Sequence, residues 1–341
     1  MGRSEDGCIR VGVVGLGRLW ESRHKPALAR LRDRYEVVSV YDQVGRRAEI
    51  EARQLGCVAA YGLVELLEMK RVDAVLLLAP QWFGLHALEL CVGAGKAIYL
   101  AFPWMADLGE VERLAVKVEE SGVPFMAEMP RRFYPVTLRL RELLATRLGE
   151  PRLIVGQVRL HGFDRYGEPG PSRQLAPGSL LVDPGCNLID WCRFMVGEEP
   201  TEVWGEASEL MPTGERDWGP DCQQVFLRFT GGKVAALLMM RHHAQAWGEA
   251  GRFLPQPGIQ VYAERGAAWL EMPDRIQWSD ATGVHEERLP MEPSVGERLA
   301  VQFARLVRGE ASLAPTMRDV VSVCRLVDRL RGEGRSGNGR V

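Results

Sequence analysis

Long hydrophobic runs and paired cysteine motifs are both missing from this sequence of 341 residues. A membrane-spanning helix needs about 20 consecutive apolar residues, and no run approaches that length. The polar residues at 1–7 do not resemble a secretory signal. The seven cysteines are scattered and contain no Cys-x-x-Cys pair, which excludes a disulfide or zinc framework and favours free thiols in a reducing cytoplasm.

A strong net charge is also missing. The formal charge is −2 at pH 7, which gives no electrostatic reason to expect nucleic acid or an anionic membrane as a partner. There is no P-loop, no serine–histidine–aspartate order and no cluster with metal-ligand spacing, so no metal is expected. What remains is an ordinary globular composition, 46% apolar and 26% charged, in a chain long enough for two domains.

The first third of the chain alternates apolar strands with helices. In the stretch 73–78 the residues after Asp73 are continuously apolar, as expected of a strand buried on both faces. Strands that alternate with helices at this spacing predict an α/β domain with a parallel, doubly wound sheet of the Rossmann type. We place this domain at residues 1–130. Its expected strands are 9–14, 36–41, 58–61, 73–78, 97–100 and 124–127.

Beyond residue 150 strands follow one another directly, which predicts an α+β domain with an open, mostly antiparallel sheet. Gly231-Gly232 is expected to turn a hairpin within it. This domain covers residues 131–331, and the glycine-rich residues 332–341 are expected to form a disordered tail. The expected strands are 153–160, 202–208, 224–230, 233–240, 260–263 and 267–271, and the expected terminal helices are 297–307 and 317–331.

A glycine loop joins the first strand to a helix. In Gly-x-Gly-x-x-Gly loops the first glycine makes a tight turn, the second admits a pyrophosphate and the third allows close helix packing. Here the third position is Trp20. Pro26 should kink the following helix or begin a second one, and the sequence leaves both open. We expect the loop to bind a dinucleotide through Gly15, Leu16, Gly17, Arg18 and Leu19.

Asp42 ends the second strand, about 25 residues beyond Gly17. An acidic residue at this point can hydrogen-bond both ribose hydroxyls of a dinucleotide, which slightly favours NAD over NADP. Arg46 and Arg47 weaken this preference, because either offers a site for a 2′-phosphate. The alternative is an aspartate on a solvent-facing loop.

Four stretches of the chain resemble the glucose–fructose oxidoreductase, inositol dehydrogenase and MocA family. They are Gly12–Gly17, the string GKAIYLAFP at 95–103, RRFYP at 131–135 and DPGCNLID at 183–190. The likeness spans nearly the whole chain. It implies a nucleotide-binding domain followed by an open-sheet domain, and the oxidation or reduction of sugars or cyclitols with NAD(P).

The family's usual proton-handling residues are absent from this chain. The family usually reads Glu-Lys-Pro where this chain has Ala101-Phe102-Pro103, and it usually has a histidine where this chain has Asn187. A phenyl ring cannot exchange a proton, and a carboxamide does not do so near neutral pH. Since alcohol oxidation requires a base and the reverse reaction an acid, another residue must take this role.

The candidate catalytic residues lie before and within the 183–190 string. Asp183 keeps the family position, and either acts on a substrate hydroxyl or caps a helix. Asn187 suits hydrogen bonding to substrate. His161 and Tyr166 lie on a long loop rich in glycine and proline, for which an ordinary polar surface loop is the alternative. Glu128, which follows the sixth strand, is a further carboxylate expected to face the cleft.

Aromatic residues gather just past the ends of the parallel strands, where ligands bind in open sheets of this type. They either wall a flat ligand, plug the crevice or pack between domains, and the sequence leaves these alternatives open. The aromatic set is Trp20, Trp82, Phe83, Phe102 and Trp104. We expect Pro80 and Trp82 to contact the cofactor, and Phe102, Trp104, Arg131 and Asp190 to contact the substrate.

Together these features favour an NAD(P)-dependent oxidoreductase whose substrate departs from simple sugars. Its cofactor would be absent if Trp20 plugs the site. An inactive homologue that binds a ligand or a partner protein is the main alternative, and a non-redox enzyme with tightly held NAD is another. We expect a small-molecule substrate, no nucleic acid or membrane partner, a cytoplasmic location, and a homodimer or homotetramer formed through the exposed sheet face.

Overall fold

The computed structural model describes residues 7–78, 84–101, 107–161, 180–208, 220–242 and 258–336. The chain divides into two compact units. Unit 1 is Met1–Pro130 with Glu292–Val321, and unit 2 is Arg131–Met291 with Ser322–Val341. Unit 1 contains a parallel sheet and unit 2 a mostly antiparallel sheet, so the expected fold class is confirmed.

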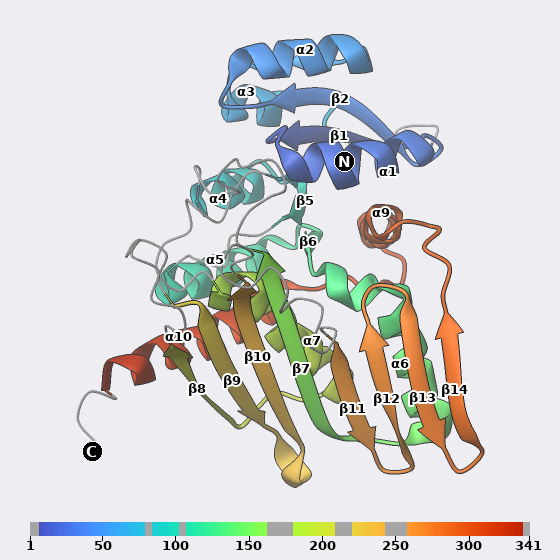
Figure 1. Ribbon diagram of the computed structural model, residues 1–341. Helices are drawn as coiled ribbons and strands as arrows, with labels where there is room; N and C mark the ends of the chain where they lie inside the picture. Colours follow the sequence, from blue (N-terminus) through green and yellow to red (C-terminus); the bar gives the residue numbers. More distant parts are fainter. Residues whose placement is uncertain are drawn as a thin grey trace. The chain divides into compact units, whose positions relative to one another are not determined.

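Unit 1 is built on a six-stranded sheet with the order β3-β2-β1-β4-β5-β6, in which all pairs are parallel (Figure 1). The order changes direction between β1 and β4, and ligands of such sheets bind at the carboxyl ends of the strands beside that point. Every residue of β4 and β5 is buried, as in strands covered on both faces. The strands are β1 (Ile9–Val14), β2 (Tyr35–Tyr41), β3 (Val58–Ala59), β4 (Ala74–Leu77), β5 (Ala97–Leu100) and β6 (Phe125–Ala127).

The helix that follows the glycine loop has a π-turn, Trp20–His24, directly before α1 (Lys25–Arg30). The Lys25 N–H donates to the Trp20 carbonyl, five residues back. Pro26 has no N–H to donate, and the wider turn before it accommodates this missing hydrogen bond. Residues 18 to 30 are all helical, but the helix changes from the π-turn to α1 between His24 and Lys25, directly before Pro26, so an irregularity lies where the proline predicted one.

Two of the remaining helices of unit 1 end at a glycine in the left-handed conformation. Gly56 and Gly122 have φ values of 69° and 63°, in the left-handed region that favours glycine, and they terminate α2 and α5. Asp107 caps the start of α5, where its side chain accepts from the Glu110 N–H at 3.0 Å. These helices are α2 (Gly45–Leu55), α3 (Leu63–Glu68), α4 (His86–Gly93), α5 (Leu108–Ser121) and α9 (Val295–Val307).

The segment that contains α9 belongs to unit 1, although the sequence analysis places residues 292–321 in the second domain. Gly296 lies so close to the first helix that a Cβ there would be 2.5 Å from the Arg23 carbonyl oxygen. Because this close packing joins residues far apart in the sequence, composition and periodicity give no sign of it. The expected division at residue 131 is therefore incomplete, because residues 292–321 return to unit 1.

Unit 2 is built on an eight-stranded sheet with the order β14-β13-β12-β11-β7-β10-β9-β8. Its pairs are antiparallel except β7 with β10. The hairpin expected at Gly231-Gly232 is confirmed, because β9 and β10 pair on either side of it. The strands are β7 (Pro151–His161), β8 (Glu202–Ser208), β9 (Cys222–Arg228), β10 (Val234–His242), β11 (Ile259–Ala263), β12 (Gly266–Glu271), β13 (Arg275–Asp280) and β14 (Gly283–Arg288).

The last two strands, β13 and β14, were not expected from the sequence. Only Ile276 and Trp278 are buried in β13, and no residue of β14 is buried. Strands this polar lack the apolar alternation that identifies a half-buried strand. They form because β12 offers them a pairing edge.

Helices α6 (Pro135–Leu143), α7 (Cys186–Val196) and α10 (Met317–Ser336) lie along one face of the unit 2 sheet (Figure 1). The alternating burial of the strands identifies this face as the core side. Helix α10 continues to Ser336, so the first part of the expected disordered tail is helical, and the remaining residues lie outside the described ranges. No helix in the described ranges is both long enough and apolar enough to cross a membrane.

Candidate functional site

The glycine loop follows β1 at the carboxyl end of the unit 1 sheet. Gly15 has a φ of 94° and donates its N–H to the Tyr41 carbonyl at 2.8 Å, so the turn requires glycine here. Gly17 is exposed, and a Cβ built there meets nothing within 4 Å. The backbone at Gly17 is therefore open to a ligand, in the way a pyrophosphate requires.

The Asp42 carboxylate ties this loop to the end of β2. Its Oδ2 accepts from the Leu16 N–H at 2.8 Å and its Oδ1 from the Val44 N–H at 2.9 Å. Arg47 Nη1 lies 3.2 Å from Oδ1, whereas Arg46 is exposed. Asp42 is 4% exposed, so the alternative of an aspartate on a solvent-facing loop is wrong. A carboxylate offers about four acceptor sites, and here the two backbone amides take two of them while Arg47 Nη1 faces both oxygens, also lying 3.3 Å from Oδ2, so a ribose hydroxyl would have to take the place of Arg47.

Trp20 occupies the interior of unit 1. The residue is 1% exposed, and its indole Nε1 donates to Glu51 Oε1 at 3.0 Å. Glu51 lies in the second half of α2, and its other oxygen accepts from Lys25 Nζ at 2.9 Å. The ring is therefore packed inside unit 1 against α2, and the interpretation of Trp20 as a wall around a ligand is wrong. The helix accommodates the large ring through its π-turn.

The carboxyl ends of β4 and β5 lead into residues 79–83 and 102–106, which lie outside the described ranges. The expected cofactor and substrate contacts on these two segments, and the other rings of the aromatic set, are not placed by the structure. They are Pro80, Trp82, Phe83, Phe102 and Trp104. At the end of β6 the expectation that Glu128 faces a cleft is wrong. Its side chain is buried, with His24 Nε2 2.9 Å from its Oε2.

In unit 2 the 183–190 string forms a π-turn, Leu181–Gly185, followed by α7. The two N-cap positions are Leu180 and Gly185, and neither has a capping side-chain hydrogen bond. Asp183 lies within the π-turn and at neither of these positions, and its role as a helix cap or as a catalytic carboxylate stays a prediction. Its side chain lies outside the described part, as do the His161 side chain and all of Tyr166. Asn187 is the second residue of α7 and is half-buried.

Asp190 lies at the centre of a buried ion-pair network. Its Oδ2 accepts from Arg132 Nε at 2.8 Å, and its Oδ1 accepts from Arg132 Nη2 at 2.5 Å and from Arg193 Nη1 at 3.2 Å. Arg193 Nε also donates to Glu199 Oε2 at 2.8 Å. Asp190 is 1% exposed, so the expected substrate contact is replaced by a structural role. Arg131, the other expected contact, is half-buried, with Nη1 3.2 Å from Met272 Sδ.

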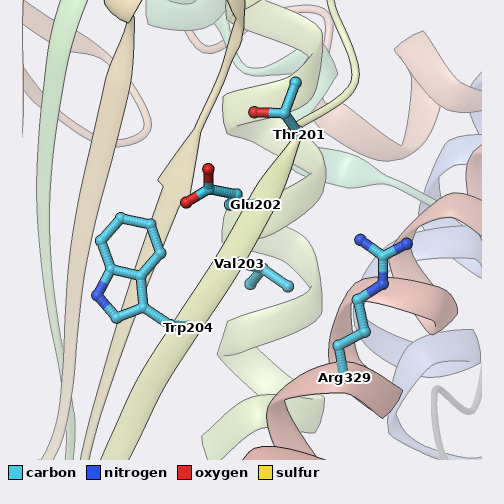
Figure 2. A pocket seen from close by; sticks show the side chains of 5 residues that line it. All are labelled: Thr201, Glu202, Val203, Trp204 and Arg329. Atoms are coloured by element: carbon cyan, nitrogen blue, oxygen red, sulfur yellow. The ribbon is translucent and has the colours of Figure 1, made fainter.

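A pocket of about 360 Å³ lies elsewhere in unit 2, at the edge strand β8. Figure 2 shows that Val203 points toward α10, which contributes Arg329, while Glu202 and Trp204 point the other way. None of the residues that the sequence identifies as site candidates lines it. The full lining is Thr201, Glu202, Val203, Trp204 and Arg329.

Metal binding and thiol chemistry find no support in the described ranges. No group of three or more histidine, cysteine, aspartate or glutamate residues there could hold a metal ion. Burial raises the pKa of the Cys91 and Cys324 thiols to about 12, so neither is poised as a nucleophile. The described groups that remain as candidates are the glycine loop with the Asp42 carboxylate and the start of α7 with the Asn187 amide.

Comparisons with known proteins agree with this geometry. A sequence model described as the oxidoreductase family with an NAD-binding Rossmann fold (GFO_IDH_MocA) matches residues 9–129, and one for the GFO/IDH/MocA C-terminal domain matches residues 137–269. Inositol 2-dehydrogenase of Rhizobium meliloti is 25% identical over 330 residues, which cover 94% of this chain and 95% of that protein. Myo-inositol 2-dehydrogenase of Thermotoga maritima is 26% identical over 266 residues, 77% of this chain and 75% of that protein.

Solved structures show the same fold. UDP-N-acetylglucosamine 3-dehydrogenase from Acidithiobacillus ferrooxidans superposes with a TM-score of 0.79 at 18% identity, covering 96% of this chain and 98% of that one. A 3-ketoreductase from Actinomadura kijaniata, solved with NADP, has a TM-score of 0.77 at 20% identity, covering 95% of this chain and 97% of that one.

Proposed function

The chain belongs to the GFO/IDH/MocA family of oxidoreductases with an NAD-binding Rossmann fold, and from this premise we propose that it is an NAD(P)-dependent oxidoreductase with a non-standard proton donor. The observation that carries the proposal is the glycine loop. Its exposed Gly17 remains open while Asp42 holds the Leu16 amide, so the cofactor-binding geometry persists although the family's lysine and histidine positions hold other residues.

In this proposal the backbone of Gly15 to Leu19 binds the pyrophosphate and Asp42 binds the adenosine ribose. When bound, the nicotinamide supplies or accepts the hydride. NAD is favoured because the Asp42 carboxylate repels a 2′-phosphate at short range. Arg46 and Arg47 oppose this preference, and Arg47 already neutralises part of the Asp42 charge.

Titration with NADH and with NADPH, followed by nicotinamide fluorescence, tests the cofactor proposal. We expect saturable binding of NADH, weakened about tenfold by Asp42→Ala because a charged hydrogen-bond acceptor is lost. The same variant should shift the preference toward NADPH. Asp33→Ala, which removes an aspartate 70% exposed before β2, is the matched control and should change neither. If the wild type binds neither dinucleotide, the oxidoreductase proposal fails and a ligand- or partner-binding homologue replaces it.

The proton donor in this proposal is Asp183, His161 or Tyr166. Asn187 lacks a group that titrates near neutral pH, but its position at the start of α7 suits hydrogen bonding to a substrate hydroxyl. Once a substrate is known, Asp183→Asn, His161→Ala and Tyr166→Phe should be compared at fixed cofactor saturation. The donor variant should lose about a hundredfold in turnover, and unchanged turnover in all three would exclude the proposed donors.

The substrate in this proposal is a hydroxylated or keto compound larger or flatter than a simple sugar. Similar proteins are named for inositol and for trans-1,2-dihydrobenzene-1,2-diol, which share vicinal hydroxyls. Phe102 and Trp104 are proposed as ring walls, and Arg131 as the group that receives a substrate anion. Asp190 is withdrawn from this list because it is buried in its ion pairs. A panel of cyclitols, sugar nucleotides and aromatic dihydrodiols, with NADH formation as the readout, tests this assignment.

We propose that a second copy covers the open face of the unit 2 sheet. One register row across this face contains Trp204, Phe226, Ala236 and Val155. Val155 is 38% exposed. Arg159 follows on the same face, and its Nε and Nη2 are buried with no hydrogen-bond partner in the structure. Because these two nitrogens are already covered within the single chain, the surface offered to a second copy is the apolar row alone.

Light scattering after size exclusion tests the proposed oligomer. We expect a dimer or tetramer, converted to monomers by Val155→Glu because a charge would be buried in an apolar patch. Val64→Glu on α3, at a valine 53% exposed in unit 1, is the matched control. A wild type that is monomeric at micromolar concentration would overturn the proposal. We also propose a cytoplasmic location, since none of the seven cysteines forms a disulfide.

A further inference from the structure

A buried ionic cluster joins the first helix of unit 1 to the end of β6. Glu128 is 6% exposed, its Oε2 accepts from His24 Nε2 at 2.9 Å, and its Oε1 pairs with Arg23 Nη1. The Tyr99 ring of β5 packs edge-on against His24, with centroids 5.2 Å apart, and encloses the cluster on the strand side. All four side chains lie within unit 1.

The positive charge in this cluster is that of Arg23, and the negative charge is that of Glu128. Burial and the neighbouring Arg23 charge lower the pKa of His24 to about 3, so its imidazole is neutral near pH 7. A neutral imidazole can donate to a carboxylate only through a protonated nitrogen, which assigns the hydrogen to Nε2. Arg23 then neutralises Glu128. Removing Glu128 would leave a partly buried guanidinium and an imidazole without their acceptor.

Glu128 lies directly beside Ala101 across the β5–β6 edge. Leu100 is in register with Ala127, and the Glu128 N–H donates to the Leu100 carbonyl at 2.8 Å. Ala101 is buried and lies two residues beyond Tyr99, so both side chains project from the same face, the one that His24 covers. Position 101 is the one at which the Glu-Lys-Pro string would place a carboxylate.

The cluster acts on the segment that begins at the glycine loop. Arg23 and His24 are the last two residues of the π-turn that starts at Trp20. Trp20 is held by Glu51 on one side, and Arg23 and His24 are held by Glu128 on the other. The direction of this turn sets the direction of the amides at Gly17 and Arg18, one turn earlier.

We propose that Glu128 is a positioning residue for dinucleotide binding, supplying from β6 the carboxylate that the family string carries at position 101. It acts through Arg23 and His24 on the helix that opens at the glycine loop. This inference rests on the proposed function, because its main readout is dinucleotide affinity.

The test removes the carboxylate at position 128 and places one at position 101 instead. Glu128→Ala, Glu128→Gln and the double variant Ala101→Glu/Glu128→Ala are titrated with NADH at a temperature where circular dichroism shows each to be folded. We expect Glu128→Ala to weaken binding about tenfold, the size of a lost charged hydrogen bond, and Glu128→Gln to weaken it less. The double variant should recover most of that affinity. Glu89→Ala, which removes an exposed carboxylate paired with Arg113 on α5, is the control and should bind as the wild type does.

A purely structural Glu128 would lower the unfolding temperature and leave the NADH dissociation constant unchanged, which would overturn the proposal. A double variant that binds no better than Glu128→Ala would overturn it as well. If the wild type binds neither NADH nor NADPH, the proposed function fails, and amide hydrogen exchange of residues 18–24 decides this inference separately. Faster exchange in Glu128→Ala, reversed in the double variant, supports it, and unchanged exchange refutes it.

Discussion

The two units use buried carboxylates in opposite ways. In unit 1 Asp42 holds the backbone amide of Leu16 within the glycine loop and leaves Gly17 exposed. In unit 2 Asp190 holds Arg132 and Arg193, and all three side chains are buried. Asp42 shapes a surface on which a ligand can bind, whereas Asp190 stabilises the interior of unit 2.

This difference shows which part of the family's chemistry the chain has kept. Unit 1 retains a turn that requires glycine and an open backbone, both of which a dinucleotide needs. Unit 2 retains the shape of the helix start but has an amide at Asn187 and commits Asp190 to its ion pairs. We therefore propose that the chain holds its cofactor with the family's geometry and moves its proton with other groups.

The largest expected effect comes from breaking the unit 2 network. Asp190→Ala should destabilise the chain by about 4 kcal/mol, because it removes the buried carboxylate that pairs with Arg132 and Arg193. Calorimetric unfolding, in which the two units are followed as separate transitions, measures this. Glu286→Ala on the exposed strand β14 is the control and should cost less than about 1 kcal/mol. A small effect of Asp190→Ala on stability, with an altered substrate affinity instead, would show that Asp190 contacts the substrate. The contrast drawn between the carboxylates of the two units would then be wrong.

Trp20→Ala should destabilise unit 1 by about 3 kcal/mol, because a fully buried ring is replaced by a cavity and Glu51 loses a donor. Trp20→Phe keeps most of the volume and should cost about 1 kcal/mol for the lost hydrogen bond. Urea unfolding measures both values. NADH affinity should not rise in either variant, and a rise would show that the ring obstructs the glycine loop after all.

Local sequence patterns predicted most of the fold. Alternation of apolar runs with helices gave the parallel sheet, and Gly231-Gly232 gave the β9–β10 hairpin. The returning segment with α9 and the polar strands β13 and β14 were missed, since each forms through partners distant in the sequence.

The candidate site was less predictable for the same reason. Asp42 follows a local pattern, the acidic residue after the second strand, but its hydrogen bonds to the Leu16 and Val44 amides follow from no spacing rule. Trp20 breaks a local pattern, yet its role depends on Glu51 in another helix. His24 and Glu128 are 104 residues apart, and no spacing rule links them. Partner choice in the interior is set by tertiary packing, which single-sequence patterns do not encode.

The pH dependence of unit 1 stability sharpens the comparison further. The folded state keeps His24 neutral down to about pH 3, whereas the unfolded chain takes up a proton near pH 6.5. Stability is therefore fully present above pH 6.5 and should fall by about 1.4 kcal/mol per pH unit as the pH drops below it. The charged or titratable groups that face the imidazole are Arg23, Glu128 and Tyr99.

Urea unfolding of the wild type between pH 7 and pH 5 measures this slope. His24→Gln keeps a donor toward Glu128 without a titratable ring, so its stability should be nearly flat over that range. Equal slopes in both proteins would show that His24 is already protonated in the folded state, and that the unit 1 cluster is an ionic network like the one around Asp190.

The smallest expected effect concerns a half-exposed pair of unit 2. Arg139 Nε donates to Glu287 Oε2 at 2.8 Å, and this hydrogen bond holds the pKa of Glu287 below its usual value. A lowered carboxylate pKa contributes stability above the unfolded pKa of about 4.3 that is lost as the pH falls through the folded value. Glu287→Gln should therefore cost about 0.5 kcal/mol at pH 7, after allowance for solvent screening, and nothing at pH 2. A difference that persists at pH 2 would assign the loss to packing of Glu287 against Trp278, and would confine the ionic stabilisation of this unit to the buried residues around Asp190.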